Sequence, residues 1–211
     1  MSAEQPTVFV VDDDASIRKS LARLLRSAGY LVETFASARE FLASEPEGQG
    51  PSCMVLDIRM RGLDGLDLQE ELVRRDYSLP IVFITGHGDV PSSVSAMKKG
   101  AVDFLEKPFD DNELLQAVAV AHQKDSRART RLMELEEIGR RLETLTPREK
   151  EVLTYVISGM LNKQVAYALN ITEKTVIVHR GRVMEKMGVG SVAELVQLST
   201  KAGIQPAKTP S

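Results

Sequence analysis

The segment 53–57 is a short apolar run that ends on a carboxylate, with Cys, Met, Val and Leu leading directly into Asp57. Continuous apolar runs of this length are typical of strands that are buried on both faces of a parallel sheet. In open α/β sheets, ligands bind just outside the carboxyl ends of the strands. The pattern therefore predicts a buried parallel strand that presents Asp57 at the ligand-binding edge of a sheet.

Three further strand-like segments also end in polar residues, namely Asp12 with Asp13, Thr85, and Lys107. If these strands lie side by side, three acids, a hydroxyl and an amine converge at one edge. A cation stabilises such clustered carboxylates, and hard oxygen ligands suit Mg²⁺. One carboxylate can then act as a nucleophile, while the cation and Lys107 neutralise charge on a phosphoryl group during its transfer. The sequence therefore predicts a site for a divalent cation and a phosphoryl group.

Each of these residues has an ordinary structural explanation when it is taken alone. Acids after a strand often cap the next helix, as we expect for Asp14, and Thr85 with Gly86 is by itself only a loop. We interpret His87 as a loop residue that makes hydrogen bonds and His122 as a solvated helix residue. The four polar strand ends, occurring together and in this order, are what favour a phosphoryl site.

Residues 1–122 alternate strand-like and helix-like segments. The strand-like segments are 7–11, 31–35, 53–57, 81–84 and 102–106, and the helix-like segments are 17–28, 38–43, 66–75, 90–99 and a stretch that opens near residue 110. Five β–α repeats of this length imply a parallel sheet that is covered by helices on both faces.

Composition excludes several classes of protein and divides the chain by charge. No run of about 18 apolar residues occurs, so we expect no membrane span, and the first six residues lack the features of a signal peptide. Cys53 is the only cysteine, and we expect it to be a small buried apolar side chain in a reducing, cytoplasmic setting.

The net charge is −8 for residues 1–122, +1 for residues 123–143 and +4 for residues 144–211, which together give −3. This division predicts two domains with different partners, and a basic end is compatible with nucleic acid.

The segment 123–143 mixes basic and acidic side chains around Leu132, Leu135, Ile138 and Leu142, which recur at helical spacing. We interpret it as a charged helical linker that continues out of the first domain. A short dimerising coil is the alternative, although about two heptads are few for a coiled coil.

The last part of the chain, residues 144–211, reads as a small helical domain. Thr146 and Glu149 form a capping box that opens its first helix. Two further helix-like segments, 162–169 and 173–187, are joined by a tight turn, which is typical of a helix-turn-helix. The tail 205–211 contains two prolines and is predicted to be disordered.

The polar strand ends stand in four short motifs, Val10-Val11-Asp12-Asp13, Leu56-Asp57, Thr85-Gly86 and Lys107-Pro108-Phe109. Together these motifs resemble the receiver domain of two-component response regulators, and residues 144–199 resemble the LuxR-type helix-turn-helix. The whole chain is similar to response regulators of the FixJ/NarL type. The segment 84–91 leans toward the FixJ branch, as in regulators of styrene or toluene catabolism.

This resemblance implies a doubly wound, five-stranded sheet with strand order 2-1-3-4-5, followed by the helix-turn-helix domain. It implies that Asp57 accepts a phosphoryl group from a phosphohistidine of a partner sensor histidine kinase. The Mg²⁺ ligands that it implies are Asp12, Asp13, Asp57 and the backbone carbonyl of Arg59. Thr85 and Lys107 would contact the phosphoryl oxygens, and Phe104 would be an aromatic switch that turns inward as Thr85 moves.

One departure from the family pattern follows the implied acceptor. The turn usually reads Met-Pro-Gly in this family, and here it is Met60-Arg61-Gly62. Arginine cannot lock the backbone as proline does. We therefore expect the loop beside Asp57 to be less rigid than is usual in the family. The additional positive charge of Arg61 could also change how the kinase docks.

The helix 173–187 is the one that such a domain places in the major groove of DNA. The candidate DNA contacts are Lys163, Lys174, Thr175, Val178, His179, Arg180 and Arg182. Ile177 and Gly181 stand where related domains often carry a polar contact residue. Glycine inside a helix costs about 1 kcal/mol relative to alanine, which indicates either close backbone approach or a loosened helix. The alternative for this surface is the solvated face of an ordinary helical bundle.

We expect a transcription factor rather than an enzyme, in which phosphorylation of Asp57 promotes pairing of receiver domains through the faces around 90–99 and 110–122. The homodimer would bind double-stranded promoter DNA, with RNA polymerase as a further partner. Two alternatives stay open. One is a phosphatase that faintly resembles the haloacid-dehalogenase type, with Asp12 as nucleophile, and the other is a DNA-binding protein whose receiver dimerises independently of phosphate.

Overall fold

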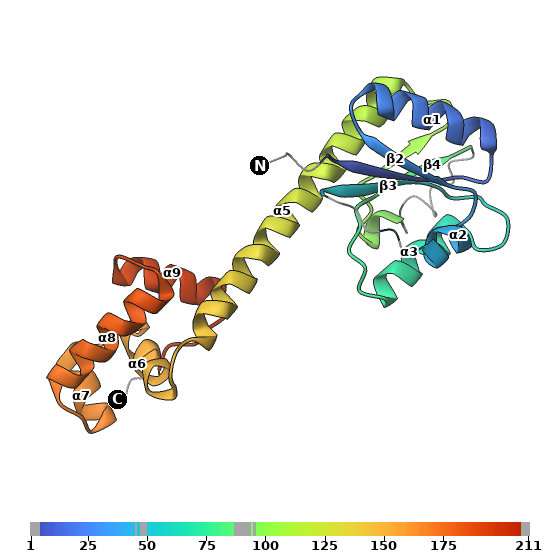
Figure 1. Ribbon diagram of the computed structural model, residues 1–211. Helices are drawn as coiled ribbons and strands as arrows, with labels where there is room; N and C mark the ends of the chain where they lie inside the picture. The colour runs from blue at the N-terminus through green and yellow to red at the C-terminus, as the bar shows by residue number, and fades with distance from the viewer. Residues whose placement is uncertain (1–4, 45, 47–49, 87–93, 95, 208–211) are drawn as a thin grey trace. The chain divides into compact units, whose positions relative to one another are not determined.

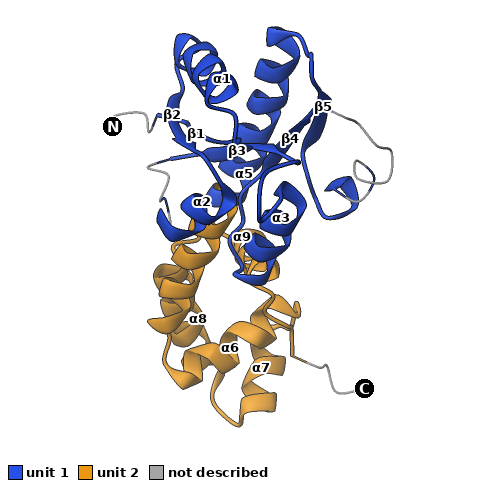
Figure 2. Ribbon diagram, turned by 90° about the vertical axis from the view of Figure 1, so that its right-hand side faces the viewer, with its two compact units in different colours: residues 1–129 blue, residues 130–211 orange. Residues whose placement is uncertain are grey.

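The computed structural model describes residues 5–44, 46, 50–86, 94 and 96–207. The chain forms two compact units, residues 1–129 and residues 130–211, which Figure 2 colours separately. None of the helices in the described ranges is both long and apolar enough to cross a membrane.

The first unit contains a five-stranded sheet. Its strands are β1 (Thr7–Val11), β2 (Leu31–Phe35), β3 (Ser52–Asp57), β4 (Ile81–Thr85) and β5 (Asp103–Glu106). All neighbouring pairs are parallel, and the strand order is β2-β1-β3-β4-β5. The doubly wound fold and its predicted strand order are therefore confirmed.

Helices cover both faces of this sheet (Figure 1). They are α1 (Ala15–Ser27), α2 (Ala38–Ser44), α3 (Gly65–Arg74) and the first part of α5 (Asp111–Glu143). Leu25 of α1 and Leu114 of α5 are buried against one face of the sheet, while Phe41 of α2 and Leu68 of α3 are buried against the other. Two apolar layers therefore enclose β1, β3 and β4, which explains why these strands read as continuous apolar runs. The helix predicted over 90–99 lies largely outside the described residues.

His122 is buried, and its interpretation as a solvated helix residue is wrong. Only 8% of its surface is exposed, its ring stacks on Tyr30 with centroids 5.0 Å apart, and its Nε2 lies 3.5 Å from Sγ of Cys53. The physical reason is helical periodicity, because His122 lies on the same face of α5 as the buried residues Leu114 and Val118. Burial lowers the pKa of this imidazole.

Asp125 ties α5 to the first residue of β3. Its Oδ2 accepts a hydrogen bond of 2.8 Å from the backbone N–H of Ser52 and one of 2.6 Å from Nε of Arg129. The carboxylate is buried, so these two donors supply the polar partners that a buried charge requires. Beyond Arg129, α5 continues without a break to Glu143, so the segment 123–143 is helical.

The second unit is all α-helical. After the last turns of α5 come α6 (Pro147–Ile157), α7 (Asn162–Leu169), α8 (Glu173–Met187) and α9 (Val192–Lys201). Its main core is lined by Ile138, Leu145, Val152, Leu153, Val156, Val183, Met187 and Leu195. Ile138 belongs to α5, so the end of that helix is an integral part of this unit.

The predicted helix starts in this unit are present. Thr146 and Glu149 form the capping box of α6, and the Thr172 side chain caps α8 by accepting from the N–H of Thr175. The turn between α7 and α8 passes through Asn170, whose φ of +51° is left-handed. This tight turn gives the helix-turn-helix that the sequence predicted.

The predicted disordered tail needs a correction at its start. The N–H of Ala207 donates to the carbonyl of Thr154 at 3.0 Å, so the chain is fixed against α6 at this point. Residues 208–211 lie outside the described residues.

Candidate functional site

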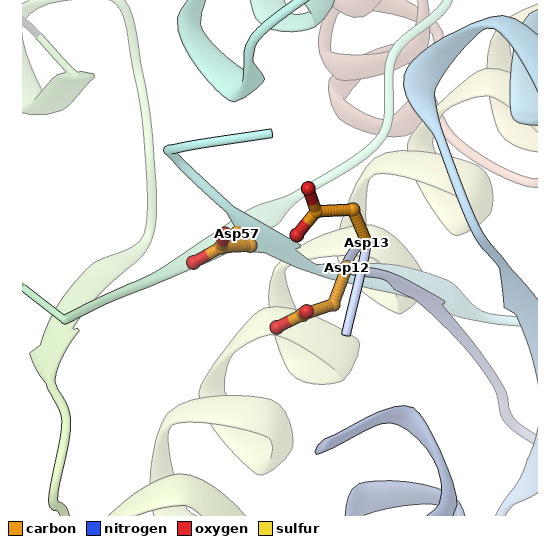
Figure 3. Close-up of side chains that lie close together, drawn as sticks. All are labelled: Asp12, Asp13 and Asp57. Atoms are coloured by element: carbon orange, nitrogen blue, oxygen red, sulfur yellow. The ribbon is translucent and has the colours of Figure 1, made fainter. Parts of the chain in front are cut away.

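The strands of the first unit deliver their polar end residues to one edge of the sheet. Asp12 follows β1, Asp57 and Thr85 end β3 and β4, and Lys107 follows β5. Figure 3 shows the carboxylates of Asp12, Asp13 and Asp57 gathered at this edge, and one oxygen from each lies within 4.8 Å of the others. The structure therefore brings these side chains together.

Lys107 is the cation that joins two of these carboxylates. Its Nζ lies 2.8 Å from Oδ2 of Asp12 and 3.0 Å from Oδ1 of Asp57. Asp12 is 1% exposed, and its other oxygen accepts the backbone N–H of Asp14 at 2.8 Å. Both oxygens of Asp12 are therefore held in place by donors.

Burial and neighbouring carboxylates disfavour the charged form of Asp57. Burial raises the pKa of the Asp57 carboxyl, and the hydrogen bond from Lys107 opposes only part of that shift. Burial acts to lower the pKa of Lys107, but its hydrogen bonds to Asp12 and Asp57 outweigh burial, so the pKa of the amine is raised overall. Lys107 contacts two of the three clustered carboxylates, and a bound cation would stabilise the cluster.

The loop after β3 makes a contact with Asp13 that sequence reasoning missed. The backbone N–H of Arg61 donates to Oδ2 of Asp13 at 3.3 Å. Proline has no N–H, so the residue that is usual in the family could not make this bond. Arg61 thus gives the exposed Asp13 carboxylate a donor that orients it toward the cluster.

Gly65 is a second residue of the site that sequence reasoning missed. A Cβ on this glycine would lie 2.4 Å from the backbone oxygen of Asp57 and 2.9 Å from Cα of Ile58. The N–H of Gly65 also donates to the carbonyl of Ile58 at 2.9 Å. The first residue of α3 therefore packs directly on the end of β3, and only glycine leaves room for that approach.

The remaining predicted residues lie around this cluster. Thr85 is 1% exposed, and its carbonyl accepts the N–H of Lys107 at 2.7 Å, which links β4 to the lysine. Phe104 is partly buried on β5 and packs with the core on the side of α2 and α3. Arg59 follows β3 with an exposed side chain. His87 lies outside the described residues.

A divalent cation fits the donor set of this edge. All three converging side chains offer carboxylate oxygens, which are the ligands that Mg²⁺ prefers, and Mg²⁺ retains waters at positions that the protein does not fill. The arrangement could therefore hold a cation beside Asp57 and Lys107 while one oxygen of Asp57 remains a nucleophile.

The second unit carries the candidate DNA contacts on and beside α8. Exposed side chains are those of Lys163, Lys174, Val178 and Arg182. Thr175, His179 and Arg180 are partly buried. Nη1 of Arg180 donates to Oδ1 of Asn162 at 3.0 Å, a contact with the start of α7 that the sequence did not reveal. Arg180 is therefore positioned by the protein, whereas Lys174 and Arg182 extend from the exposed face.

The first unit is a doubly wound sheet with an acidic cluster and a lysine at one edge, which is the arrangement of a receiver domain. The second unit contains a helix-turn-helix, which is typical of a DNA-binding domain. Family models match both parts. Residues 8–119 match the response regulator receiver domain, and residues 143–199 match the luxR family of bacterial regulatory proteins.

Known regulators are similar over nearly the whole chain. Nodulation protein W of Bradyrhizobium diazoefficiens is 50% identical over 197 residues, which cover 93% of this chain and 86% of that protein. Transcriptional regulatory protein FixJ of Azorhizobium caulinodans is 43% identical over 205 residues, with 97% and 96% covered. The solved structure of the response regulator StyR aligns with a TM-score of 0.84 and 47% identity, covering 93% of this chain and 99% of that one.

The chain belongs to the two-component response regulators that combine a receiver domain with a LuxR-type DNA-binding domain. The predicted FixJ/NarL type is thereby confirmed. The FixJ relatives are transcriptional regulatory proteins.

Proposed function

We propose that Asp57 accepts a phosphoryl group from a phosphohistidine of a sensor histidine kinase, and that this modification promotes dimerisation and binding to promoter DNA. The observation that carries the proposal is the convergence of Asp12, Asp13 and Asp57 within 4.8 Å, with Nζ of Lys107 3.0 Å from Asp57. The receiver family supports a histidine kinase as partner, and the luxR-family domain supports DNA.

In the proposed transfer, an oxygen of Asp57 attacks the phosphorus while the bond from phosphorus to the imidazole nitrogen breaks. The electron pair of that bond stays on the imidazole, which leaves as the neutral side chain. Asp12, Asp13 and Asp57, with the carbonyl of Arg59, would hold Mg²⁺, and the bound cation would neutralise charge on the phosphoryl oxygens. Lys107 already contacts Asp57 and would contact one of these oxygens after transfer.

The proposed switch begins at the end of β4. The hydroxyl of Thr85 would donate to a phosphoryl oxygen, and Phe104 on the neighbouring β5 would turn into the space that Thr85 leaves. Pairing of receiver domains through the 110–122 face has one supporting feature, because Val120 of α5 is 51% exposed. A dimer places two recognition helices on paired half-sites, where RNA polymerase is a further candidate partner.

Intact-mass spectrometry after incubation with Mg²⁺ and acetyl phosphate tests the acceptor. We expect one phosphoryl adduct on the wild type and none on Asp57→Asn. Asp76→Asn is the matched control, because Asp76 is an exposed residue after α3 whose left-handed φ of +55° asparagine tolerates. It should be labelled like the wild type. An adduct that persists on Asp57→Asn would refute Asp57 as the acceptor.

Selection of duplexes from a random library tests the output. The phosphorylated protein should enrich paired half-sites, and its apparent affinity should exceed that of Asp57→Asn treated in the same way. Equal affinities of the two proteins, with labelling intact, would favour the reading in which the receiver dimerises independently of phosphate.

A phosphatase function with Asp12 as nucleophile has less support. Both oxygens of Asp12 are engaged by donors, Lys107 and the N–H of Asp14. One labelling event without continued release of phosphate is the expected outcome of the mass experiment, whereas steady turnover of a phosphate ester would support the phosphatase.

A further inference from the structure

The exposed face of α8 carries an uncovered apolar strip, which we define as Ile177, Val178 and Gly181. Ile177 is 56% exposed and Val178 is 47% exposed, whereas Val176 and Val183 on the opposite side of the helix are fully buried. The second unit therefore already has the apolar side of α8 in its core. The strip is additional apolar surface on the side that is turned outward.

Gly181 follows Ile177 and Val178 by one helical turn, so all three share a face. A Cβ on Gly181 would have no atom within 4 Å, so packing within the described structure does not require glycine there. Glycine in a helix interior costs about 1 kcal/mol relative to alanine. Packing within the described structure gives no reason for a glycine at this position. A partner that approaches the helix backbone closely at Gly181 would give one.

Cations flank this strip on the same face. Lys174 lies one turn before Ile177 and Arg182 follows Gly181 directly, and both are exposed. The apolar strip lies between two cationic side chains. This arrangement complements a polyanion that has apolar groups at the bottom of a groove between its negative charges. In the major groove of DNA, the C5-methyl of thymine is the apolar group on the base edges. A protein partner would have to present apolar groups and carboxylates together, whereas the luxR-family match of this unit favours DNA.

We propose that the apolar strip reads thymine, with Ile177 and Val178 packing on C5-methyl groups and Gly181 allowing the base edge close to the helix. This inference rests on the proposed DNA binding and adds to it the kind of base that is recognised. It assigns sequence discrimination to Ile177, whose side chain has no charge and no hydrogen-bonding group. It also explains the glycine as a requirement of binding and not of folding.

The test uses duplexes that the full-length phosphorylated protein selects from a random library. Each thymine is replaced in turn by deoxyuridine, which lacks only the C5-methyl. At one or two positions per half-site, affinity should fall about fourfold, as expected for one buried methyl group. Ile177→Ala should bind the thymine and uracil duplexes equally at the position that Ile177 covers, and Val178→Ala should do so at its own position.

Two further variants make the test specific. Val196→Ala removes an exposed apolar side chain from α9 and should leave the uracil penalty unchanged. Gly181→Ala should raise the thermal stability of the protein while it weakens DNA binding, two effects of opposite sign that a merely loosened helix would not give.

The outcomes separate this inference from the proposed function. Sequence-specific binding that is indifferent to uracil at every thymine, or a penalty that survives in both Ile177→Ala and Val178→Ala, would overturn the thymine reading alone. Failure of the wild type to select any sequence would overturn the proposed DNA binding and this inference with it.

Discussion

Arg61 contacts the candidate metal site through its backbone, because its N–H donates to Asp13. Its N–H holds Oδ2 of Asp13 at 3.3 Å, and a carboxylate has enough lone pairs to accept this bond and bind a cation together. Partners that orient metal ligands contribute measurably to metal affinity. Arg61→Pro removes the N–H, so we expect Mg²⁺ binding, measured by calorimetry, to weaken by about three- to tenfold.

The matched control for this change is Arg61→Ala, which deletes the cation and keeps the N–H. Its Mg²⁺ affinity should remain close to that of the wild type. If Arg61→Ala and Arg61→Pro bind Mg²⁺ equally well, the hydrogen bond to Asp13 has no role in the site.

Individual site residues could be predicted from the sequence where the pattern of strands fixes their position in the sheet. Asp57 and Thr85 end strands, Asp12 and Lys107 directly follow strands, and the rule for parallel sheets places strand ends together. The contact of Arg61 with Asp13 joins residues 48 positions apart, and it depends on a loop path that no local pattern specifies. Such contacts need the folded structure.

Among the elements, α3 approaches the end of β3 closely at Gly65. A Cβ on Gly65 would meet the backbone of Asp57 at 2.4 Å, and backbone atoms cannot move aside as a flexible side chain can. Gly65→Ala must therefore displace α3 or the end of β3. We expect a loss of about 1–3 kcal/mol in the free energy of unfolding and slower labelling by acetyl phosphate.

Gly86→Ala is the control for this prediction, since Gly86 follows Thr85 at the same edge and a Cβ there meets no atom of the described residues within 4 Å. It should label at nearly the wild-type rate. Wild-type stability and labelling in Gly65→Ala, measured by urea unfolding and intact mass, would show that the junction is not tight in solution.

A buried carboxylate, that of Glu149, joins α6 to α8 in addition to their shared apolar core. Oε2 of Glu149 accepts a hydrogen bond of 2.6 Å from Nζ of Lys186 and one of 2.9 Å from the N–H of Thr146. The hydrogen bond from Lys186 is the largest of the causes that lower the pKa of Glu149 to about 2. Because the folded pKa lies below the ordinary value of 4.5, this stabilisation is complete above about pH 4.5 and is lost as the pH falls toward 2.

Glu149→Gln should therefore lose on the order of 2 kcal/mol of stability at neutral pH. In urea unfolding followed by circular dichroism, the difference from the wild type should shrink as the pH is lowered through this window. Glu151→Gln, which changes an exposed carboxylate on the same helix, should have little effect at any pH. A difference that is independent of pH would contradict the ionic origin of the effect.

Local signals also explain which elements were predictable. The bounds of α7 and α8 agree with the predicted segments 162–169 and 173–187, because helix starts and turns carry their own side-chain signatures. The burial of His122 was missed, although its spacing from Leu114 and Val118 on α5 indicates it. The hydrogen bond that anchors Ala207 was missed because it joins the tail to Thr154, which is distant in the sequence.

The whole molecule is acidic, and this constrains how it can bind DNA. Residues 1–122 carry a net −8, residues 144–211 a net +4, and the chain −3. Attraction to DNA therefore has to come from a few cations near the phosphates, because interactions between exposed charges fade beyond about 8 Å at physiological salt. Weak attraction by one protomer also favours the proposed dimer on paired half-sites.

This charge distribution predicts two kinds of loss in DNA binding. Each side chain that neutralises a phosphate contributes about 0.9 to the slope of log affinity against log salt concentration. Lys163→Gln and Arg182→Gln should each weaken binding and reduce that slope by about one per bound protomer. Ile177→Ala should weaken binding at the same slope, because an apolar contact releases no counterions.

Lys201→Gln is the control for the salt series, since Nζ of Lys201 pairs with Glu134 at 2.8 Å and the residue is not among the proposed contacts. Anisotropy titrations of a labelled duplex with the full-length protein, between about 50 and 200 mM salt, give all of these slopes. If Lys201→Gln lowers the slope as much as Lys163→Gln and Arg182→Gln do, attraction is spread over the whole basic unit. If only Lys163→Gln and Arg182→Gln lower the slope, the phosphate contacts lie on the helix-turn-helix, beside the apolar strip that we propose reads thymine.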